Sequence, residues 1–354
     1  MEIQSLLHRA IDSGASDLFV VAGLPITLKI QGRQERLSEQ GNMTPALTQA
    51  FAQGIYDLAG REARCITGGA SDDDFSVSIS GIGRFRVNLF HQRGSLAAVV
   101  RVIRFGLPTA QERHIPEAVM RVAGLNKGIV LVTGPAGAGK STTLACILNE
   151  INATRTGHIL TLEDPVEYIH RHNRCIVSQR EIGCDCDSYV TALRSALRES
   201  PDVILLGEMR DKETIEVAMT AAETGQLLFS SLHTTGAANT IDRIVDAFPP
   251  NQQPQIRLQL SMVLQAVISQ QLVPDVDGVM IPVFEIMFVN LAIRNMIRES
   301  KTFQLDAAIA SGAAQGMKTM DAALLELYQQ KRITRDTVLA HCSNYDAVCK
   351  RLGV

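Results

Sequence analysis

Residues 134–141 have the types and the spacing of a phosphate-binding loop. The loop fits the pattern G-x-x-x-x-G-K-[ST] at every fixed position, and Thr142 follows it. The glycines allow successive backbone N–H groups to turn toward phosphate oxygens. The lysine can reach the β- and γ-phosphates, and the serine hydroxyl can hold Mg²⁺. The sequence therefore predicts a nucleoside triphosphate site that uses Gly134, Pro135, Ala136, Gly137, Ala138, Gly139, Lys140, Ser141 and Thr142.

Two elements flank this loop and can position it. Ile129–Val132 is a short apolar run typical of a buried strand, and a helical pattern covers Thr142–Ile151. The start of that helix places the positive end of its dipole beside a bound phosphate. A glycine-rich turn with a chance Lys-Ser pair is the alternative, and the strand–loop–helix context favours the nucleotide site.

A pair of carboxylates follows the second predicted strand. His158–Leu162 is apolar enough for a strand, and Glu163 and Asp164 come directly after it. Because Mg²⁺ takes only one or two carboxylates and keeps several waters, Ser141, phosphates, water and one carboxylate of this pair are sufficient for it, and Asp164 is the candidate. Glu163 is a candidate catalytic acid. The alternatives are a surface salt bridge for Glu163 and a turn-forming aspartate before proline for Asp164.

The third and fourth predicted strands also end in polar residues. Val203–Leu206 followed by an acid has the form of a Walker B strand, although Gly207 stands where an aspartate is common. We predict that Glu208 orients or deprotonates the attacking water, unless it is only a surface acid. His233 follows the strand at 226–232 and could hydrogen-bond the γ-phosphate, or it could be a structural side chain.

Composition limits the class of protein. The chain has 354 residues, 46% hydrophobic and 20% charged, which suits a folded protein of two domains. A net charge of −3 disfavours a nucleic-acid partner. No apolar run approaches the roughly 18–20 residues of a membrane span, and the first residues have an amphipathic helical pattern unlike a signal peptide. Seven cysteines without a C-x-x-C pair are expected to be reduced thiols of a cytoplasmic protein.

The order of the elements predicts a small α+β domain over residues 1–106, a linker over 107–115 and an α/β domain over 116–354. In the second part, strands alternate with helices, which is the pattern of a parallel sheet. In the first part, a helix at the start and another over Pro45–Arg61 accompany five strands. These strands are expected at Asp17–Val21, Ile26–Ile30, Phe75–Ser80, Arg84–Phe90 and Ala97–Ile103.

Arginines recur on the last of these strands. Arg84 and Arg86 are two residues apart and therefore share a sheet face, while Arg101 and Arg104 lie near the end of the next strand. A solvated sheet face is one interpretation. The other is a cationic face presented to the γ-phosphate, where one arginine can contribute about 10³–10⁵ in rate.

Together these segments resemble the type IV pilus retraction ATPases, the PilT family of the secretion-type ATPase superfamily. The phosphate loop, an acidic box at 161–168, a Walker B segment with Gly207-Glu208 and a His box at 231–240 occur in the family's order. A further segment closely matches the AIRNLIRE motif of retraction ATPases; without the resemblance it is only a helix with two arginines on one face. Its residues are Ala292, Ile293, Arg294, Asn295, Met296, Ile297, Arg298 and Glu299.

The resemblance implies an α/β fold with a PAS-like N-terminal domain, then a RecA-like P-loop ATPase domain with a helical C-terminal region from about residue 285. It implies a homo-hexamer that hydrolyses ATP with Mg²⁺ to retract pili for twitching motility or DNA uptake. It also implies a cytoplasmic protein, peripheral at the inner face of the membrane, whose partners are the inner-membrane pilus platform protein and the pilus machinery, without membrane insertion. Arg86 and Arg101 would sense phosphate, with Arg104 a weaker candidate.

Three departures and three alternatives accompany this resemblance. Ala136 and Ala138 replace hydroxyl residues, which should tune affinity; Phe19 replaces a histidine; Met296 replaces leucine at nearly constant volume. A pilus-assembly or type II secretion ATPase is one alternative, disfavoured because the chain lacks a tetracysteine motif. A nucleic-acid translocase is disfavoured by the net charge. A nucleotide-binding but non-hydrolysing regulatory subunit is the third.

Overall fold

The computed structural model describes residues 2–30, 32–103 and 106–353 of the chain. The chain divides into two compact units, Met1–Gly106 with Glu167–Ile169, and Leu107–Val166 with His170–Val354. Each unit has its own sheet and its own hydrophobic core, so each is described by itself.

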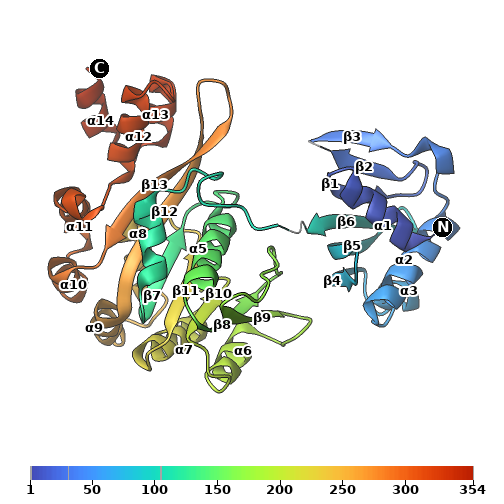
Figure 1. The fold of residues 1–354 in the computed structure, drawn as a ribbon, viewed down its shortest axis with the longest axis horizontal. Coiled ribbons are helices and arrows are strands. Elements are labelled where there is room, and N and C mark those ends of the chain that lie inside the picture. Colours follow the sequence, from blue (N-terminus) through green and yellow to red (C-terminus); the bar gives the residue numbers. More distant parts are fainter. Residues whose placement is uncertain (1, 31, 104–105, 354) are drawn as a thin grey trace. The chain divides into compact units, whose positions relative to one another are not determined.

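The N-terminal unit is a six-stranded antiparallel sheet in the order β3-β2-β1-β6-β5-β4. Its helices α1, α2 and α3 cover one face of the sheet (Figure 1). The helices are α1 (Ile3–Asp12), η1 (Ser38–Gln40), α2 (Pro45–Ala59) and α3 (Arg64–Thr67). The strands are β1 (Ala15–Val20), β2 (Thr27–Ile30), β3 (Arg33–Arg36), β4 (Asp72–Ile79), β5 (Gly83–Gln92) and β6 (Ser95–Ile103).

Alternation of apolar and polar residues explains which face of this sheet is covered. On β5, Phe85, Val87 and Leu89 are buried under the helices, while Arg84 and Arg86 lie on the other face. The five strands predicted for this part are confirmed within a few residues. Strand β3 was missed because all four of its residues are exposed, which leaves no apolar signal to find.

The second unit contains a seven-stranded sheet in the order β13-β12-β7-β11-β10-β8-β9, parallel except for β13. Its strands are β7 (Gly128–Thr133), β8 (Gly157–Glu163), β9 (Cys175–Glu181), β10 (Val203–Leu206), β11 (Leu227–Leu232), β12 (Leu264–Pro274) and β13 (Met280–Phe288). The helices before residue 264 are α4 (Glu117–Met120), η2 (Arg121–Gly124), α5 (Lys140–Thr154), α6 (Tyr189–Ala196), α7 (Lys212–Glu223), α8 (Ala237–Asp246) and α9 (Gln253–Val263).

Two hydrophobic cores lie on the two faces of this sheet. The core that holds Val130 and Val132 of β7 is closed by α4, η2 and α5, whereas the core that holds Ile129 and Leu131 is closed by α6 to α9 and two later helices. Because successive residues of a strand point to opposite faces, a strand buried on both sides has a continuous apolar run, as β7 has from Ile129 to Val132. The predicted α/β fold with a parallel sheet is confirmed, and the structure shows helices on both of its faces.

The C-terminal part departs from the prediction at its start. Residues 285–288 still belong to β13, so the helical region begins at Leu291 and not at about residue 285. The β12–β13 hairpin was missed, although Asp277-Gly278 between two apolar runs is a recognisable hairpin signal. The remaining helices are α10 (Leu291–Arg298), η3 (Thr302–Gln304), α11 (Leu305–Ser311), η4 (Ala313–Gln315), α12 (Met320–Gln329), α13 (Arg335–His341) and α14 (Tyr345–Leu352).

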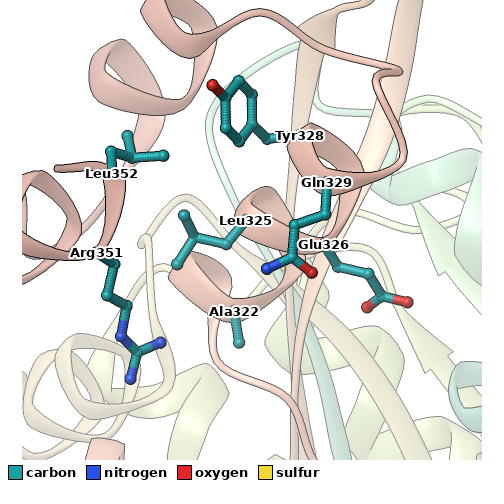
Figure 2. Close-up of a pocket in the computed structure, with 7 residues that line it drawn as sticks. All are labelled: Ala322, Leu325, Glu326, Tyr328, Gln329, Arg351 and Leu352. Carbon is teal, nitrogen blue, oxygen red and sulfur yellow. The ribbon is translucent and has the colours of Figure 1, made fainter.

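The last three helices pack beside the far end of this hairpin (Figure 1). Val273 of β12 and Val283 of β13 share a small core with Leu324 of α12, Val338 of α13 and Val348 of α14. Figure 2 shows a surface groove in this part, between α12 and α14, with Glu326 and Arg351 among its lining side chains. None of the predicted site residues lines this groove. Within the described residues, no helix is long and apolar enough to cross a bilayer.

Candidate nucleotide-binding site

The phosphate-loop residues connect β7 to α5, as predicted. Gln270 of the neighbouring strand β12 packs against the loop. Gly134 has φ 142°, and a Cβ there would lie 2.1 Å from the backbone oxygen of Gln270. Gly139 has φ 86° and precedes the first turn of α5. Thr143 of α5 donates a hydrogen bond to Gln270 Oε1 at 2.7 Å. The two glycines are therefore required by a close backbone approach and by left-handed backbone angles.

The side chain of Lys140 folds back onto the start of this loop. Its Nζ donates to the carbonyl oxygens of Gly134 and Pro135 at 2.8 and 2.9 Å, and the residue is buried. Ser141 and Thr142 occupy the first turn of α5, and the backbone N–H groups of a helix's first turn face its N-terminal end, where the loop lies. The arrangement offers an ammonium group and a helix N-terminus to an anion in one place.

His233 lies between the lysine of the loop and the Walker B glutamate. Its Nδ1 is 3.4 Å from Lys140 Nζ, and its Nε2 is 3.5 Å from Glu208 Oε2. The sheet explains this meeting, because β7, β11 and β10 are adjacent parallel strands and these three residues follow their carboxyl ends. The structure thus brings together three residues that are far apart in the sequence.

Glu208 is a largely buried carboxylate with two different oxygen environments. Its side chain is 12% exposed, and Oε1 lies 2.5 Å from Nη2 of the exposed Arg210. The hydrogen bond and charge of Glu208 raise the pKa of Arg210. The other oxygen, Oε2, accepts no hydrogen bond within the described residues. A buried acceptor without a donor beside His233 is a suitable place for a water molecule.

The two acids at the end of β8, like Glu208, influence the hydroxyl of Tyr189 on α6. Burial raises the pKa of the Tyr189 hydroxyl, and the carboxylates of Asp164, Glu208 and Glu163 raise it further, in that order. Three predicted acids therefore act electrostatically on one phenol. No group of three or more His, Cys, Asp and Glu side chains within the described residues has the arrangement of a metal site. Oxygen ligands from Ser141 and Asp164, completed by phosphate and water, still suit Mg²⁺.

Glu163 is held in a fixed orientation by its neighbours. Its Oε1 accepts hydrogen bonds from Thr161 Oγ1 at 2.7 Å and from Gln179 Nε2 at 3.2 Å. Gln179 comes from β9, the edge strand beside β8. These two donors fix the carboxylate at the carboxyl end of β8, so its side chain is positioned within the protein and is not a free surface acid.

In the N-terminal unit, Arg86 and Arg101 are direct cross-strand partners on β5 and β6. Arg86 makes a bidentate pair with Asp74, at 3.0 Å from Nε and 2.6 Å from Nη2. Arg101 Nε donates to the buried Asp17 at 2.9 Å. The two carboxylates offset the repulsion between the adjacent guanidinium groups. Arg104 lies outside the described residues.

The segment that matches the retraction motif forms α10, and its two arginines have different roles. Ile293 and Ile297 are buried in the main core. Arg294 Nη1 donates to the carbonyls of Ser261 and Met262, both at 2.9 Å, at the end of α9. Arg298 donates to Asn295 Oδ1 and stays exposed. The alternative of a solvated helix face therefore does not hold for Arg294, which caps a neighbouring helix.

Comparison with known proteins shows the family to which the chain belongs. Residues 86–336 match the family described as type II/IV secretion system protein. The chain belongs to this family. It is 45% identical to the type IV pilus retraction ATPase PilT of Pseudomonas aeruginosa, over 95% of this chain and 96% of that protein. It is 38% identical to the type IV pilus ATPase PilU of the same organism, over 97% of this chain and 89% of that protein.

A solved structure of this family agrees with the fold. The crystal structure of the pilus retraction motor PilT with bound ADP aligns over 98% of both chains, with a TM-score of 0.90 and 42% identity. The predicted membership of the secretion ATPase superfamily and the predicted two-part α/β fold are thus confirmed. The chain shares its fold with a family member that binds an adenine nucleotide.

Sequence reasoning missed three residues of this site. Arg210 could have been found, because a basic residue two positions after Glu208 can reach back to it. Tyr189 and Gln270 carry no such signal. Their approach to Gly207 and to the phosphate loop depends on how α6 and β12 pack, and neither lies in a recognised motif.

Proposed function

We propose that this protein is an ATPase motor that drives type IV pilus retraction. One observation carries the catalytic part of the proposal: His233 lies between Lys140 and Glu208, which joins the phosphate loop to the candidate base. The similarity to PilT over nearly the whole chain supports the motor part. Twitching motility and DNA uptake are the processes that such retraction would serve.

The chemistry assigned to the site is attack of water on the γ-phosphorus of ATP. The new bond joins the water oxygen to phosphorus while the bond to the bridging oxygen of ADP breaks, which releases ADP and phosphate. Glu208 Oε2 orients the water and accepts its proton, Lys140 binds the β- and γ-phosphates, and His233 contacts the departing phosphate. Glu163, which Thr161 and Gln179 hold at the end of β8, is the second candidate catalytic carboxylate.

Mg²⁺ bound with the nucleotide would neutralise phosphate charge, and Ser141 and Asp164 are the side chains that we propose would hold it. The loop that binds the phosphates is Gly134, Pro135, Ala136, Gly137, Ala138, Gly139, Lys140, Ser141 and Thr142. Of its two alanines, Ala138 is buried and Ala136 is exposed. Because backbone N–H groups make the cradle, these alanines are expected to tune affinity without abolishing binding.

The N-terminal unit, the oligomer and the partners form the second half of the proposal. We propose a homo-hexamer in which Arg86 and Arg101 exchange their carboxylate partners for nucleotide phosphate during the cycle. Residues 1–106 and 116–354 would be the two moving domains, joined by 107–115. The motor would work on the cytoplasmic side, peripheral to the inner membrane through a pilus platform protein, with α10 as the segment specific to retraction.

Two experiments test the proposal. Purified protein should release phosphate from ATP, and deletion of the gene should leave hyperpiliated cells that do not retract their pili. A protein that binds ATP without releasing phosphate would instead be a regulatory subunit. Loss of pili on deletion would indicate a pilus-assembly or secretion ATPase. The chain is similar to both PilT and PilU, so it could be the principal or an accessory retraction motor. The severity of the retraction defect in the deletion strain distinguishes these two possibilities.

A further inference from the structure

Glu285 on β13 is a buried carboxylate that receives the first backbone N–H group of two helices. The residue is 4% exposed. Its Oε1 accepts from Ala237 N, at the start of α8, at 2.7 Å, and its Oε2 accepts from Met320 N, at the start of α12, at 3.2 Å. Burial raises the pKa of this carboxyl, although both N–H groups oppose the shift. Each oxygen of the Glu285 carboxylate therefore caps the N-terminus of a different helix.

The first of these helices begins directly after the segment that carries His233. Ser269 is the cross-strand partner of Glu285, and its Oγ accepts from Gly236 N at 2.9 Å. Gly236 adopts φ 83°. The β12–β13 hairpin therefore holds the end of the loop 233–236 with two side chains, one at Gly236 and one at Ala237. This attachment lies only three and four residues beyond His233.

We infer that Glu285 is a positioning residue for ATP hydrolysis, which acts by setting the start of α8 and, through it, the place of His233 between Lys140 and Glu208. The inference rests on the proposed ATPase function. The hydrogen bonds of Glu285 described above go to the starts of α8 and α12, so we assign its effect to the catalytic step and not to nucleotide binding. Catalytic groups displaced by about 1 Å can lose on the order of a hundredfold in rate.

The first test compares Glu285→Gln with the parent in a phosphate-release assay. The amide keeps one acceptor oxygen but presents an NH₂ group to the second backbone N–H. We expect kcat to fall about tenfold to a hundredfold while KM stays within about twofold. Thr319→Ala is the matched control, because Thr319 Oγ1 accepts from Ala322 N at 3.3 Å and so caps the start of α12 and not that of α8. Its kcat should equal that of the parent.

The second test asks whether Glu285 acts through His233. In the His233→Ala background, adding Glu285→Gln should lower kcat no further, because the positioned group is already gone. A side chain that only stabilises the fold would instead multiply the two losses. Ser269→Ala provides an independent variant with the same expected pattern, and it replaces Glu285→Gln if that protein does not fold.

Several results would overturn the inference. These are a parent-like kcat in Glu285→Gln, multiplied losses in the double variant, a changed KM with constant kcat, or the same loss in Thr319→Ala. Failure of the proposed function itself is distinguishable, because the parent protein would then release no phosphate in the same assay.

Discussion

The hydroxyl of Tyr189 occupies the space that a side chain at Gly207 would need. A Cβ built on Gly207 would lie 2.7 Å from Tyr189 Oη and 3.3 Å from the backbone oxygen of Leu162. An aspartate is common at the position before a Walker B glutamate, and here it would force Tyr189 to move. The carboxylates of this site must therefore come from the end of β8 and from Glu208, around the phenol that fills the gap.

The first prediction concerns this contact. Gly207→Ala should lower the stability of the protein by about 1–3 kcal/mol, because overpacking a close contact forces side chains or backbone to shift. Adding Tyr189→Phe removes the oxygen that a new Cβ would meet, so the double variant should recover part of the loss. Thermal unfolding midpoints of the parent, both single variants and the double variant measure the effect.

Recovery should be incomplete, since the carbonyl of Leu162 stays in place. Tyr189→Phe alone serves as the control for loss of the hydroxyl. Simple addition of the two single effects would show that residues 189 and 207 do not meet.

The second prediction separates binding from chemistry in the nucleotide site. Glu208→Gln should retain ATP affinity and lose about 10²–10⁴ in kcat, because the amide cannot take the proton from water. Lys140→Ala should lose affinity as well, because the ammonium binds the phosphates. Phosphate release and titration with a fluorescent nucleotide measure the two effects. If Glu208→Gln hydrolyses ATP as fast as the parent, another residue is the base.

The third prediction divides the two arginines of α10. Arg294→Ala should destabilise the protein by about 1–2 kcal/mol, since it leaves two carbonyls at the end of α9 without their charged donor. Arg298→Ala should stay within about 0.5 kcal/mol of the parent, because the residue is exposed. We expect both variants to bind nucleotide and to lose pilus retraction. Unfolding midpoints and twitching assays test this.

Arg294→Lys is the matched control for the first variant, because it keeps a cation at the end of α9. Wild-type twitching in Arg298→Ala would remove that side chain from the retraction mechanism, whatever its neighbour does.

The fourth prediction concerns the thiol of Cys146 on α5. Burial raises its pKa to about 11, and its Sγ donates to the carbonyl of Pro108 at 3.1 Å. Thiolate is the reactive form, so at pH 8 Cys146 should alkylate at least about 100-fold more slowly than an exposed thiol. Its rate should keep rising beyond pH 10, and the exposed Cys184 is the comparison thiol in the same protein. Mass spectrometry of alkylated protein from pH 7.5 upward measures both residues, and equal rates would contradict the burial.

The local patterns of the chain were enough to predict much of the fold. Strands β7, β8, β10 and β11 and the loop at 134–141 follow from apolar runs and from the spacing of glycine, lysine and serine, because these signals are contained within about ten residues. The same holds for the strands of the N-terminal unit. The β12–β13 hairpin was overlooked despite a turn signal, and β3 had none because it is polar throughout.

The motifs also named most of the candidate site, since Lys140, Glu208 and His233 each follow a recognisable strand. The contacts among these three residues depend on the tertiary structure. Whether His233 reaches Lys140 and Glu208 depends on the strand order β7-β11-β10, and the cap that Arg294 makes on α9 depends on packing between helices. Tyr189 against Gly207, Gln270 against the phosphate loop and Glu285 beneath two helix starts have no local signature. Contacts between residues far apart in the chain are set by how whole elements pack, and no short stretch of sequence contains that information.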